Sequence, residues 1–520
     1  MRCVEQTAFK LEHTVTTLFL SHSSQDGSTA STVKERLRRQ GYESVFLDFD
    51  PQQGIPAGTD WEQELYRQLR ASRAVIALVS KSWLESRWCF AEVFYAKALG
   101  KPVFPLRIDS CELDPVLSAF QAIDCHPPRE EAYERLWQGL SRAGLGPLSG
   151  YAFRPGQSPY PGLESFQETD AAVYFGREHE IGLIMELLSR VRRVGEPRMV
   201  VVVGSSGSGK SSLVRAGLIP RLRKDPERWA VLPVFRPGSE PTRELARVLS
   251  VMTADSDRPE SYEQIHERFC ECPAEITQDV RSRSVLLEII RRTVLRKASA
   301  EATALLVVDQ FEEVFGASAP EDARRFLTLL REAVNERAQP LVVLAALRSG
   351  FLGEFQNRPE VAALSFEAFP LGPMCAEHFP QVIRGPAALA GMEFEDRLVD
   401  RMVRDTPSGE ALPLLAFSLR LLYDRCCGQP KLTTAAYDQI LGSVEQALAR
   451  TAETLVAGAR TTGRAEAALR SAFLKLVRID QQGRVVRAAA AWQELPADAH
   501  ALLERLVNEP GRFLVIPGNE

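Results

Sequence analysis

The sequence predicts an α/β protein with two parallel sheets in series, followed by a mostly helical C-terminal part. Three observations predict this class. Residues 15–143 alternate short apolar runs with helical periodicity, residues 173–372 repeat that alternation around a glycine-rich loop, and the pattern beyond Met374 is mostly helical. Such alternation places helices on both faces of a parallel sheet. A chain of 520 residues is also too long for one hydrophobic core, so several domains are expected.

The first region is expected to form a doubly wound sheet, whose ligand site lies at the carboxyl ends of the strands. The expected strands are 17–20, 44–47, 74–79, 103–106 and 122–125. The expected helices are 29–40, 61–71, 82–99 and 129–142. Residues 146–172 are rich in glycine and proline, which predicts a linker behind this domain.

A glycine-rich loop stands at the start of the second region, between a four-valine strand and a helix. The run Val200-Val-Val-Val-Gly-Ser-Ser-Gly-Ser-Gly-Lys-Ser211 has the spacing of a phosphate-binding loop, in which backbone N–H groups and a helix N-terminus attract the anion. We expect Lys210 to reach the β- and γ-phosphates and the Ser211 hydroxyl to bind Mg²⁺. The expected nucleotide-binding residues here are Gly204, Ser205, Gly207, Ser208, Gly209, Lys210, Ser211 and Ser212. The alternative is a glycine-rich turn without a ligand.

A second acidic element completes this expected site. Leu305-Leu-Val-Val-Asp309 reads as a buried strand that ends in an aspartate able to steady Mg²⁺. Gln310 cannot act as a base, so Glu312 or Glu313 is expected to position the attacking water; alternatively, one of them only begins the next helix. Arg348 ends the following strand and is expected either to sense the γ-phosphate or to form a structural ion pair.

The remaining elements of the second and third regions are less regular. The expected strands of the second sheet are 199–203, 230–235, 304–308, 341–347 and 366–371. Residues 254–280 are irregular and receive no assignment. Pro386 and Pro413 are expected at helix starts. Residues 484–488 are expected to pair with 513–516 as a β-ribbon, which would suit a winged helix.

Polar segments follow three neighbouring strands of the first sheet. They are Ser21-His-Ser23, Asp48-Phe-Asp50 and Ser80-Lys-Ser82. Just beyond the third, Trp88 and Glu92 share one helix face by their i,i+4 spacing. A carboxylate beside an aromatic wall suits ribose binding and the stabilisation of an oxocarbenium-like state; an isolated helical glutamate is otherwise a solvated group.

These segments resemble the boxes of Toll/interleukin-1 receptor (TIR) domains. The run Thr17-Leu-Phe-Leu-Ser-His-Ser-Ser-Gln-Asp26 resembles the first box, 49–61 the loop after the second strand, and 80–92 the box that carries the catalytic glutamate of TIR NAD glycohydrolases. The resemblance implies a flavodoxin-like fold over residues 1–145, NAD⁺ as substrate and Glu92 as the catalytic residue. Ser21, His22 and Phe49 are candidate NAD-binding residues by their place at the rim, and the alternative for His22 is a surface loop histidine. Trp61 and Trp88 are expected either to form a wall of the NAD pocket or to be packed core aromatics.

The second region resembles STAND-class ATPases, signalling relatives of AAA proteins. Tyr174-Phe-Gly-Arg-Glu178, Val308-Asp-Gln-Phe-Glu-Glu313 and Leu412-Pro-Leu-Leu-Ala-Phe417 carry this resemblance. It implies nucleotide contacts from Arg177 and Pro413 and a P-loop NTPase of the parallel αβα type. The expected domains are 173–373 (NTPase), 374–460 (helical) and 461–520 (winged-helix-like). Relatives continue into a repeat sensor that this chain does not show, so a truncated product and a form sensed by a partner both stay open.

The two resemblances together imply a nucleotide-regulated immune-type effector. ATP with Mg²⁺ would drive homo-oligomerisation, and the clustered TIR domains would cleave NAD⁺ and halt an infected cell. The trigger would be a phage protein or a separate sensor. The main alternative is a non-enzymatic TIR scaffold that recruits other TIR proteins. A nucleotide-regulated transcription factor is a third, disfavoured by the lack of a basic recognition helix.

Composition and charge indicate which cellular compartment and which classes of partner to expect. The net charge of −5 gives no general attraction for nucleic acid or anionic membrane, so nucleic acid is not an expected partner. No apolar run approaches the ~20 residues of a membrane span. The 9 cysteines show no CxxC pair, which favours reduced thiols in the cytoplasm over a structural zinc site.

Overall fold

A computed structural model describes residues 18–508, apart from gaps within this range. The gaps are residues 41, 43–44, 49–60, 113, 116, 118–119, 144, 146–152, 154–155, 196, 254–258, 273–283, 296–297, 300, 317–318, 336–339, 363, 407–410, 427–428, 430, 458–462, 480–484 and 488–489. The chain divides into two compact units, Met1–Arg154 with Phe166–Leu389, and Pro155–Ser165 with Ala390–Glu520.

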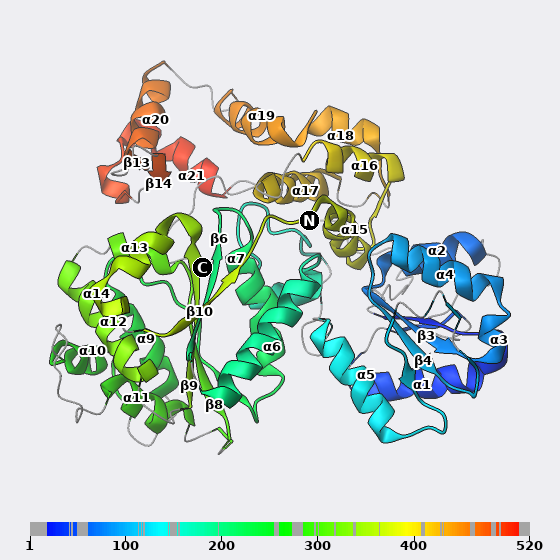
Figure 1. Cartoon of the computed structure of the whole chain (residues 1–520). Helices are drawn as coiled ribbons and strands as arrows, with labels where there is room; N and C mark the ends of the chain where they lie inside the picture. The colour runs from blue at the N-terminus through cyan, green and yellow to red at the C-terminus, as the bar shows by residue number, and fades with distance from the viewer. Residues whose placement is uncertain are drawn as a thin grey trace. The chain divides into compact units, whose positions relative to one another are not determined.

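The N-terminal part of the first unit is a five-stranded parallel sheet with helices on both faces (Figure 1). The strands β1 (Leu18–Ser21), β2 (Val45–Phe46), β3 (Ala74–Val79), β4 (Val103–Arg107) and β5 (Ile123–Asp124) lie in the order β2-β1-β3-β4-β5. Helices α1 (Gly27–Arg39) and α5 (Glu130–Arg142) cover one face, and α2 (Trp61–Ala71) and α4 (Arg87–Ala98) the other. This is the predicted flavodoxin-like order.

The sheet order places the candidate residues together. Strand β1 pairs in parallel with both β2 and β3, so the carboxyl ends of these three strands meet at one edge. The residues that follow β1, β2 and β3 therefore share a rim, as the polar segments of the sequence predict.

A second five-stranded parallel sheet lies in the same unit (Figure 1). Strands β6 (Met199–Gly204), β7 (Trp229–Val231), β8 (Thr303–Val308), β9 (Leu341–Arg348) and β10 (Phe366–Pro370) follow the order β10-β6-β9-β8-β7. The helices of this part are α6 (Glu178–Val194), α7 (Lys210–Ser212), α8 (Ile219–Arg223), α9 (Pro241–Thr253), α10 (Tyr262–Cys270), α11 (Val285–Ile290), α12 (Pro320–Asn335), α13 (Leu352–Asn357), α14 (Pro359–Ala362) and α15 (Phe379–Leu389). Strand β6 lies beside β9, and β9 beside β8, so the ends of β6 and β8 lie at the same edge of the sheet.

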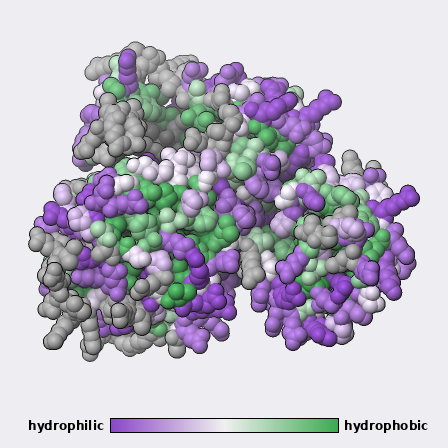
Figure 2. All heavy atoms as spheres, viewed as in Figure 1, coloured by the Kyte–Doolittle hydropathy of each residue, from purple (hydrophilic) through white to green (hydrophobic). Residues whose placement is uncertain are grey.

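The surface of the chain mixes polar and apolar side chains. On the face drawn in Figure 2, hydrophilic side chains cover much of the surface, with hydrophobic ones between them. Within the described part of the chain, no helix combines the length and the apolar character needed to cross a membrane.

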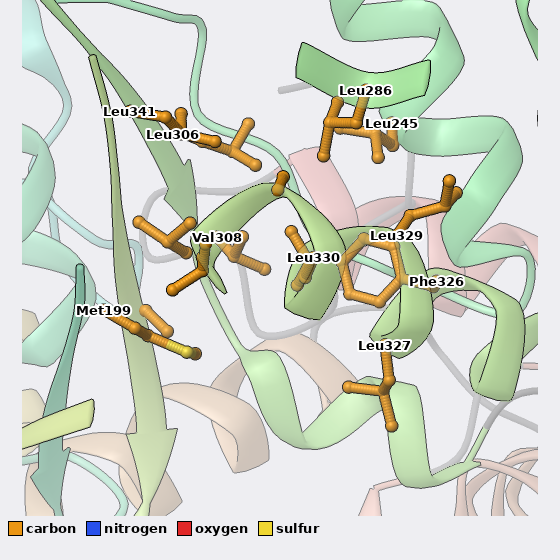
Figure 3. Close-up of a cluster of buried hydrophobic side chains, with 14 of the residues drawn as sticks. Met199, Leu245, Leu286, Leu306, Val308, Phe326, Leu327, Leu329, Leu330 and Leu341 are labelled. Carbon is orange, nitrogen blue, oxygen red and sulfur yellow. The ribbon is translucent and has the colours of Figure 1, made fainter. Parts of the chain in front are cut away.

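The second sheet has a separate hydrophobic core on each face. One core joins β8 and β9 to helices α9–α12; Figure 3 labels Leu306 and Val308 of β8 and Leu330 of α12 among its side chains. The other core packs α6 and the P-loop helix against the opposite face, through side chains such as Ile184 and Leu213. Strands buried on both faces explain why they read as uninterrupted apolar runs.

The second unit is mostly helical. Its helices are α16 (Asp396–Arg404), α17 (Leu412–Cys426), α18 (Thr434–Ile440), α19 (Val444–Ala457), α20 (Gly463–Lys475) and α21 (His500–Asn508). Strands β11 (Glu393–Phe394) and β12 (Lys431–Leu432) pair in parallel, and β13 (Val477–Ile479) pairs antiparallel with β14 (Val485–Arg487). Within the described residues the partner of β14 is the nearby segment β13; the expected pairing with 513–516 lies outside them and stays a prediction. A partner close in sequence has less loop entropy to overcome.

Two further expectations differ from the structure. The expected helix 82–99 is two helices, α3 (Lys81–Leu84) and α4, because the side chain of Ser86 caps the N-terminus of α4. Pro386 lies inside α15 instead of at its start; there Gly385 packs so closely on the Phe175 ring that a Cβ would lie 2.8 Å from it. Tertiary packing overrides the local preference of proline.

Residues 254–280, for which the sequence predicts no element, include the helix α10. Helix α10 begins after Ser261, whose hydroxyl accepts from the backbone N–H of Gln264, while the Gln264 side chain accepts from the backbone N–H of Ser261. This capping box is a readable sequence signal for a helix start.

Candidate functional site

The first candidate site is built on the rim at the ends of β1 and β3. Ser21 is the last residue of β1, and His22 follows it; both are buried. Ser80 follows β3, donates to Asp26 Oδ2 at 2.6 Å and accepts from the backbone N–H of Trp83, which caps α3. The structure thus brings together the polar segments after β1 and β3.

Glu92 of α4 is the buried carboxylate of this rim. It is 6% exposed, and its Oε2 has no hydrogen-bond partner among the described residues. Burial raises the pKa of Glu92 to about 8; a hydrogen bond with Ser21 works against this shift, and the charge of Asp48 adds to it. The solvated-surface alternative for Glu92 is therefore wrong, because the side chain is buried and holds a proton near neutral pH.

Trp83 and Cys89 belong to the same cluster, although the sequence reading missed them as site residues. Trp83 is fully buried, and its Nε1 donates to the Ser21 hydroxyl at 3.1 Å. The Cys89 thiol donates to the carbonyl oxygen of His22 at 3.3 Å, and burial raises its pKa to about 12. The available signal was the position of both residues between Ser80 and Glu92, the box singled out by its resemblance.

His22 lies beside Asp48 on the same rim. Its Nε2 is 3.5 Å from Asp48 Oδ1. Burial lowers the pKa of His22, while Asp48 raises it, so the imidazole is favoured in its neutral form. His22 is a buried rim residue instead of the surface histidine that was the alternative. Phe49, the next expected rim residue, lies outside the described residues.

Trp61 and Trp88 form an exposed aromatic pair. Their ring centroids are 4.9 Å apart in an edge-to-face arrangement, and the residues are 37% and 43% exposed. The packed-core alternative is therefore wrong for both. Their expected contact with NAD⁺ stays a prediction.

The second candidate site is the glycine-rich loop between β6 and α7. Gly207 and Gly209 have φ angles of +79° and +89°, which residues with a Cβ rarely adopt. The helix continues from α7 through a π-helical segment, Leu213–Leu218, into α8. Two buried hydroxyls of the loop, those of Ser205 and Ser208, have no hydrogen-bond partner among the described residues. Buried, unsatisfied donors around a loop of this shape fit a phosphate ligand.

Lys210 is folded over the loop that precedes it. Its Nζ donates to the carbonyl oxygens of Gly204 at 2.9 Å and Ser205 at 2.8 Å. Burial lowers the pKa of Lys210, and the charge of Glu312 is the largest influence that opposes this shift. The ammonium group therefore lies against the start of the glycine-rich loop.

Asp309 directly follows β8, one residue beyond the last residue of the strand, and it lies against the P-loop helix. It is fully buried, and its Oδ1 accepts from the Ser211 hydroxyl at 2.8 Å and from the backbone N–H of Gln310 at 3.0 Å. A serine hydroxyl beside a carboxylate fits a Mg²⁺ site. The other oxygen, Oδ2, accepts from Arg215 Nε at 3.1 Å, a contact that the sequence reading missed.

The three remaining polar residues of this site are also close together. Glu312 accepts from Arg348 Nε at 2.8 Å and from the Arg348 backbone N–H at 3.2 Å. The ion pair considered for Arg348 is therefore present. Glu313 accepts from the backbone N–H of Gly238 at 3.0 Å, and burial raises its pKa. Both glutamates have structural partners, and their roles toward water stay predictions.

Three other expected nucleotide residues have distinct positions. Arg177 is buried behind the loop, where it donates to the carbonyl oxygens of Ser208 at 3.0 Å and Gly372 at 2.9 Å and pairs with Glu180. Ser212 accepts from the backbone N–H of Phe166 at 3.1 Å. Pro413 lies in the first turn of α17, as expected for a helix start, and belongs to the second unit.

Comparison with protein families gives two matches. The model of the family described as Novel STAND NTPase 1 matches residues 159–519, and the model of the TIR domain matches residues 18–137. No curated protein matches the chain.

Solved structures similar to this chain include proteins of two kinds. The Aeropyrum pernix ORC1 protein, solved in complex with DNA, is 15% identical, with 62% of this chain and 77% of that chain covered and a TM-score of 0.38. The Thermotoga maritima RuvB Holliday junction branch migration motor is 14% identical, with 65% and 98% covered and a TM-score of 0.33. The TIR domain of the Toll-related receptor TRR-2 from Hydra magnipapillata is 16% identical, with 24% and 96% covered and a TM-score of 0.21.

Proposed function

The chain belongs to the Novel STAND NTPase 1 family and carries a TIR domain ahead of the NTPase, and from this premise we propose that it is an NAD⁺-cleaving effector controlled by nucleotide. ATP binding to the NTPase would drive self-association, and the clustered TIR domains would break the glycosidic bond of NAD⁺. A phage protein or a separate sensor would act as the trigger, in the cytoplasm. Loss of NAD⁺ would then stop the infected cell.

The nucleotide site supports the regulatory half of this proposal. The loop residues Gly204–Ser212 would cradle the phosphates, and Lys210 would supply a positive charge to them. Mg²⁺, when bound, would neutralise phosphate charge, held by the Ser211 hydroxyl and by Asp309. We assign the positioning of water to Glu312, since its charge acts on Lys210 most strongly and since it contacts Arg348. ADP would occupy the same loop in the resting protein.

The proposed NAD⁺ cleavage rests mainly on Glu92, whose buried Oε2 has no hydrogen-bond partner among the described residues. A carboxyl group in this state fits a ligand that donates hydroxyl groups, such as a ribose, and that carries positive charge. In the proposed reaction, the bond between ribose C1′ and the nicotinamide nitrogen breaks, and its electron pair stays on the nitrogen. Water then adds to C1′, which gives nicotinamide, ADP-ribose and one proton; attack by an adenine nitrogen instead would give a cyclic product.

Glu92 would act by stabilising the charge that develops on the ribose ring in the transition state. The positive nicotinamide ring would favour the ionised carboxylate as NAD⁺ enters. Ser21 and Trp83 would hold Glu92 in place through the hydrogen bond from Nε1 to the Ser21 hydroxyl. The exposed Trp61–Trp88 pair would form a wall of the NAD⁺ pocket.

The test is nicotinamide release from NAD⁺ by the full chain, crowded on beads in the presence of ATP and Mg²⁺. Crowding replaces the unknown trigger. We expect release by the wild-type chain and a loss of at least about a hundredfold in Glu92→Gln. Glu85→Gln is the matched control, because Glu85 is an exposed glutamate just ahead of α4, and this variant should keep wild-type activity.

A non-enzymatic scaffold is the second candidate. The exposed aromatic side chains Trp88 and Phe94 on α4 favour it, since such groups are enriched at protein interfaces. A scaffold would keep its signalling in Glu92→Gln. Absence of NAD⁺ turnover by the crowded chain, with a known TIR hydrolase active in the same assay, would support the scaffold and reject the enzyme.

A further inference from the structure

The carboxyl group of Asp309 lies in a fully buried position. A buried carboxylate must be compensated by hydrogen bonds and by an opposite charge, because removing it from water is costly. Its Oδ1 has two neutral donors, the Ser211 hydroxyl and the Gln310 N–H. The opposite charge lies beside the other carboxylate oxygen, Oδ2.

Arg215 supplies that charge from the P-loop helix. Its Nε donates to Asp309 Oδ2 at 3.1 Å, and its side chain is only 15% exposed. Its Nη1 donates to the side-chain oxygen of Gln167 at 3.2 Å. The guanidinium is therefore fixed on two sides.

The two oxygens of Asp309 thus have different surroundings. Oδ1 faces Ser211, the residue that belongs to the expected metal site, whereas Oδ2 faces Arg215. Arg215 can stay in place whether or not a metal ion is near Oδ1. A second arginine, Arg236, lies farther from Oδ2, at 3.9 Å, and its side chain is 32% exposed, so its compensation is weaker.

We propose that Arg215 is a fixed counter-ion of Asp309 that allows this site to bind nucleotide phosphates without depending strongly on Mg²⁺. Without Arg215, the carboxylate would keep only the weaker compensation from Arg236 and would repel the phosphates more strongly, so that binding would depend more on the metal ion. Arg215 is thus a positioning residue that acts on the nucleotide through Asp309. The inference rests on the nucleotide site proposed above and adds a property to it.

The test measures the affinity of the full chain for ADP carrying an N-methylanthraniloyl fluorophore, in excess Mg²⁺ and in EDTA. The quantity compared is the ratio of Kd in EDTA to Kd in Mg²⁺. In Arg215→Met we expect this ratio to be at least about tenfold above that of the wild type, mainly through weaker binding in EDTA. For Arg215→Lys, which keeps the charge, the ratio should lie between those of the wild type and Arg215→Met. Arg223→Met, in the exposed part of the same helical run, is the matched control and should match the wild type.

A double-variant cycle separates this role from a structural one. In an Asp309→Asn background the carboxylate charge is absent, so Arg215→Met should no longer change the ratio. A ratio for Arg215→Met within about twofold of the wild type would overturn the inference, as would an equal rise with Asp309→Asn present. If Arg215→Met does not fold, Arg215→Gln takes its place under the same criteria, since it keeps a donor without the charge.

The same measurement separates the two proposals. Failure of the wild-type chain to bind the probe in either condition would reject the nucleotide site and the inference with it. Normal binding with an unchanged ratio in the variant would reject the inference alone.

Discussion

Glu92 is the residue whose protonation most directly couples the structure to pH. Burial raises the pKa of Glu92 to about 8 from the value of 4.5 for the free side chain. Between these two values the folded chain keeps a proton that the unfolded chain has lost. The stability contributed by neutral Glu92 is therefore fully present below pH 4.5 and is lost as the pH rises through 8.

We predict that Glu92→Gln is more stable than the wild type by an amount that grows with pH. Glutamine does not titrate, so the difference in unfolding free energy should increase by roughly 3 kcal/mol between pH 4.5 and pH 7. Calorimetry of both chains across this range measures it. A pH-independent difference for Glu92→Gln would contradict the assigned burial.

Trp83 is fully buried beneath the rim, and its side chain donates one hydrogen bond to Ser21. Trp83→Phe removes the donor to Ser21 and leaves space in the core, so we expect a loss of about 2 kcal/mol in unfolding free energy. Denaturant unfolding measures this loss. The stability control is Trp61→Phe, at a 37% exposed position, which should change stability by less than about 0.5 kcal/mol. Equal effects in the two variants would argue against the role given to Trp83.

At the level of elements, the turn from β6 into α7 depends on the smallest residue at its start. A Cβ on Gly204 would lie 2.6 Å from the carbonyl oxygen of Leu371 and 2.7 Å from the Ser208 hydroxyl. Leu371 is itself bound to β6, because its N–H donates to the Val203 carbonyl at 2.7 Å. The strand end therefore has no room to give way.

We predict that Gly204→Ala lowers the unfolding free energy by about 2 kcal/mol and weakens ADP binding by about tenfold or more. Thermal unfolding and fluorescent-nucleotide titration measure the two effects. Gly353→Ala in α13 is the control: no atom lies within 4 Å of its added Cβ, so stability should stay equal or rise by up to about 1 kcal/mol. Unimpaired nucleotide binding by Gly204→Ala would show that the loop tolerates a shift at this point.

For the whole molecule, the overall charge bears on the choice of partners. The net charge is −5. Affinity for duplex DNA comes mainly from neutralised phosphates, which an acidic chain does not provide without a basic patch.

We therefore predict that the full chain binds a 30-base-pair duplex with a Kd weaker than about 10 µM at 0.15 M salt. Fluorescence anisotropy of labelled DNA measures this, with and without ATP and Mg²⁺. Tighter binding that falls steeply with added salt would revive the nucleotide-regulated transcription factor as a reading of this chain.

The sequence alone determined the parts of this protein that depend on neighbouring residues. The phosphate-binding loop, Asp309 at the end of its strand and the doubly wound alternation are short-range patterns, because the strand, the turn and the helix start each have local physical requirements. The position of Glu92 near Ser21 followed from the order of the boxes. Local reading failed where packing or capping prevailed, as at Pro386 inside α15 and at Ser86, where one expected helix became two.

Only the tertiary structure decided which distant side chains meet. Trp83 with Ser21 and Arg215 with Asp309 are 62 and 94 residues apart in the chain, and no local pattern links them. Burial decided the rest: the pKa of Glu92 and the exposure of Trp61 and Trp88 depend on what surrounds each side chain in space. Because desolvation and charge pairing act through distance and not through sequence separation, they become visible only once the chain is folded.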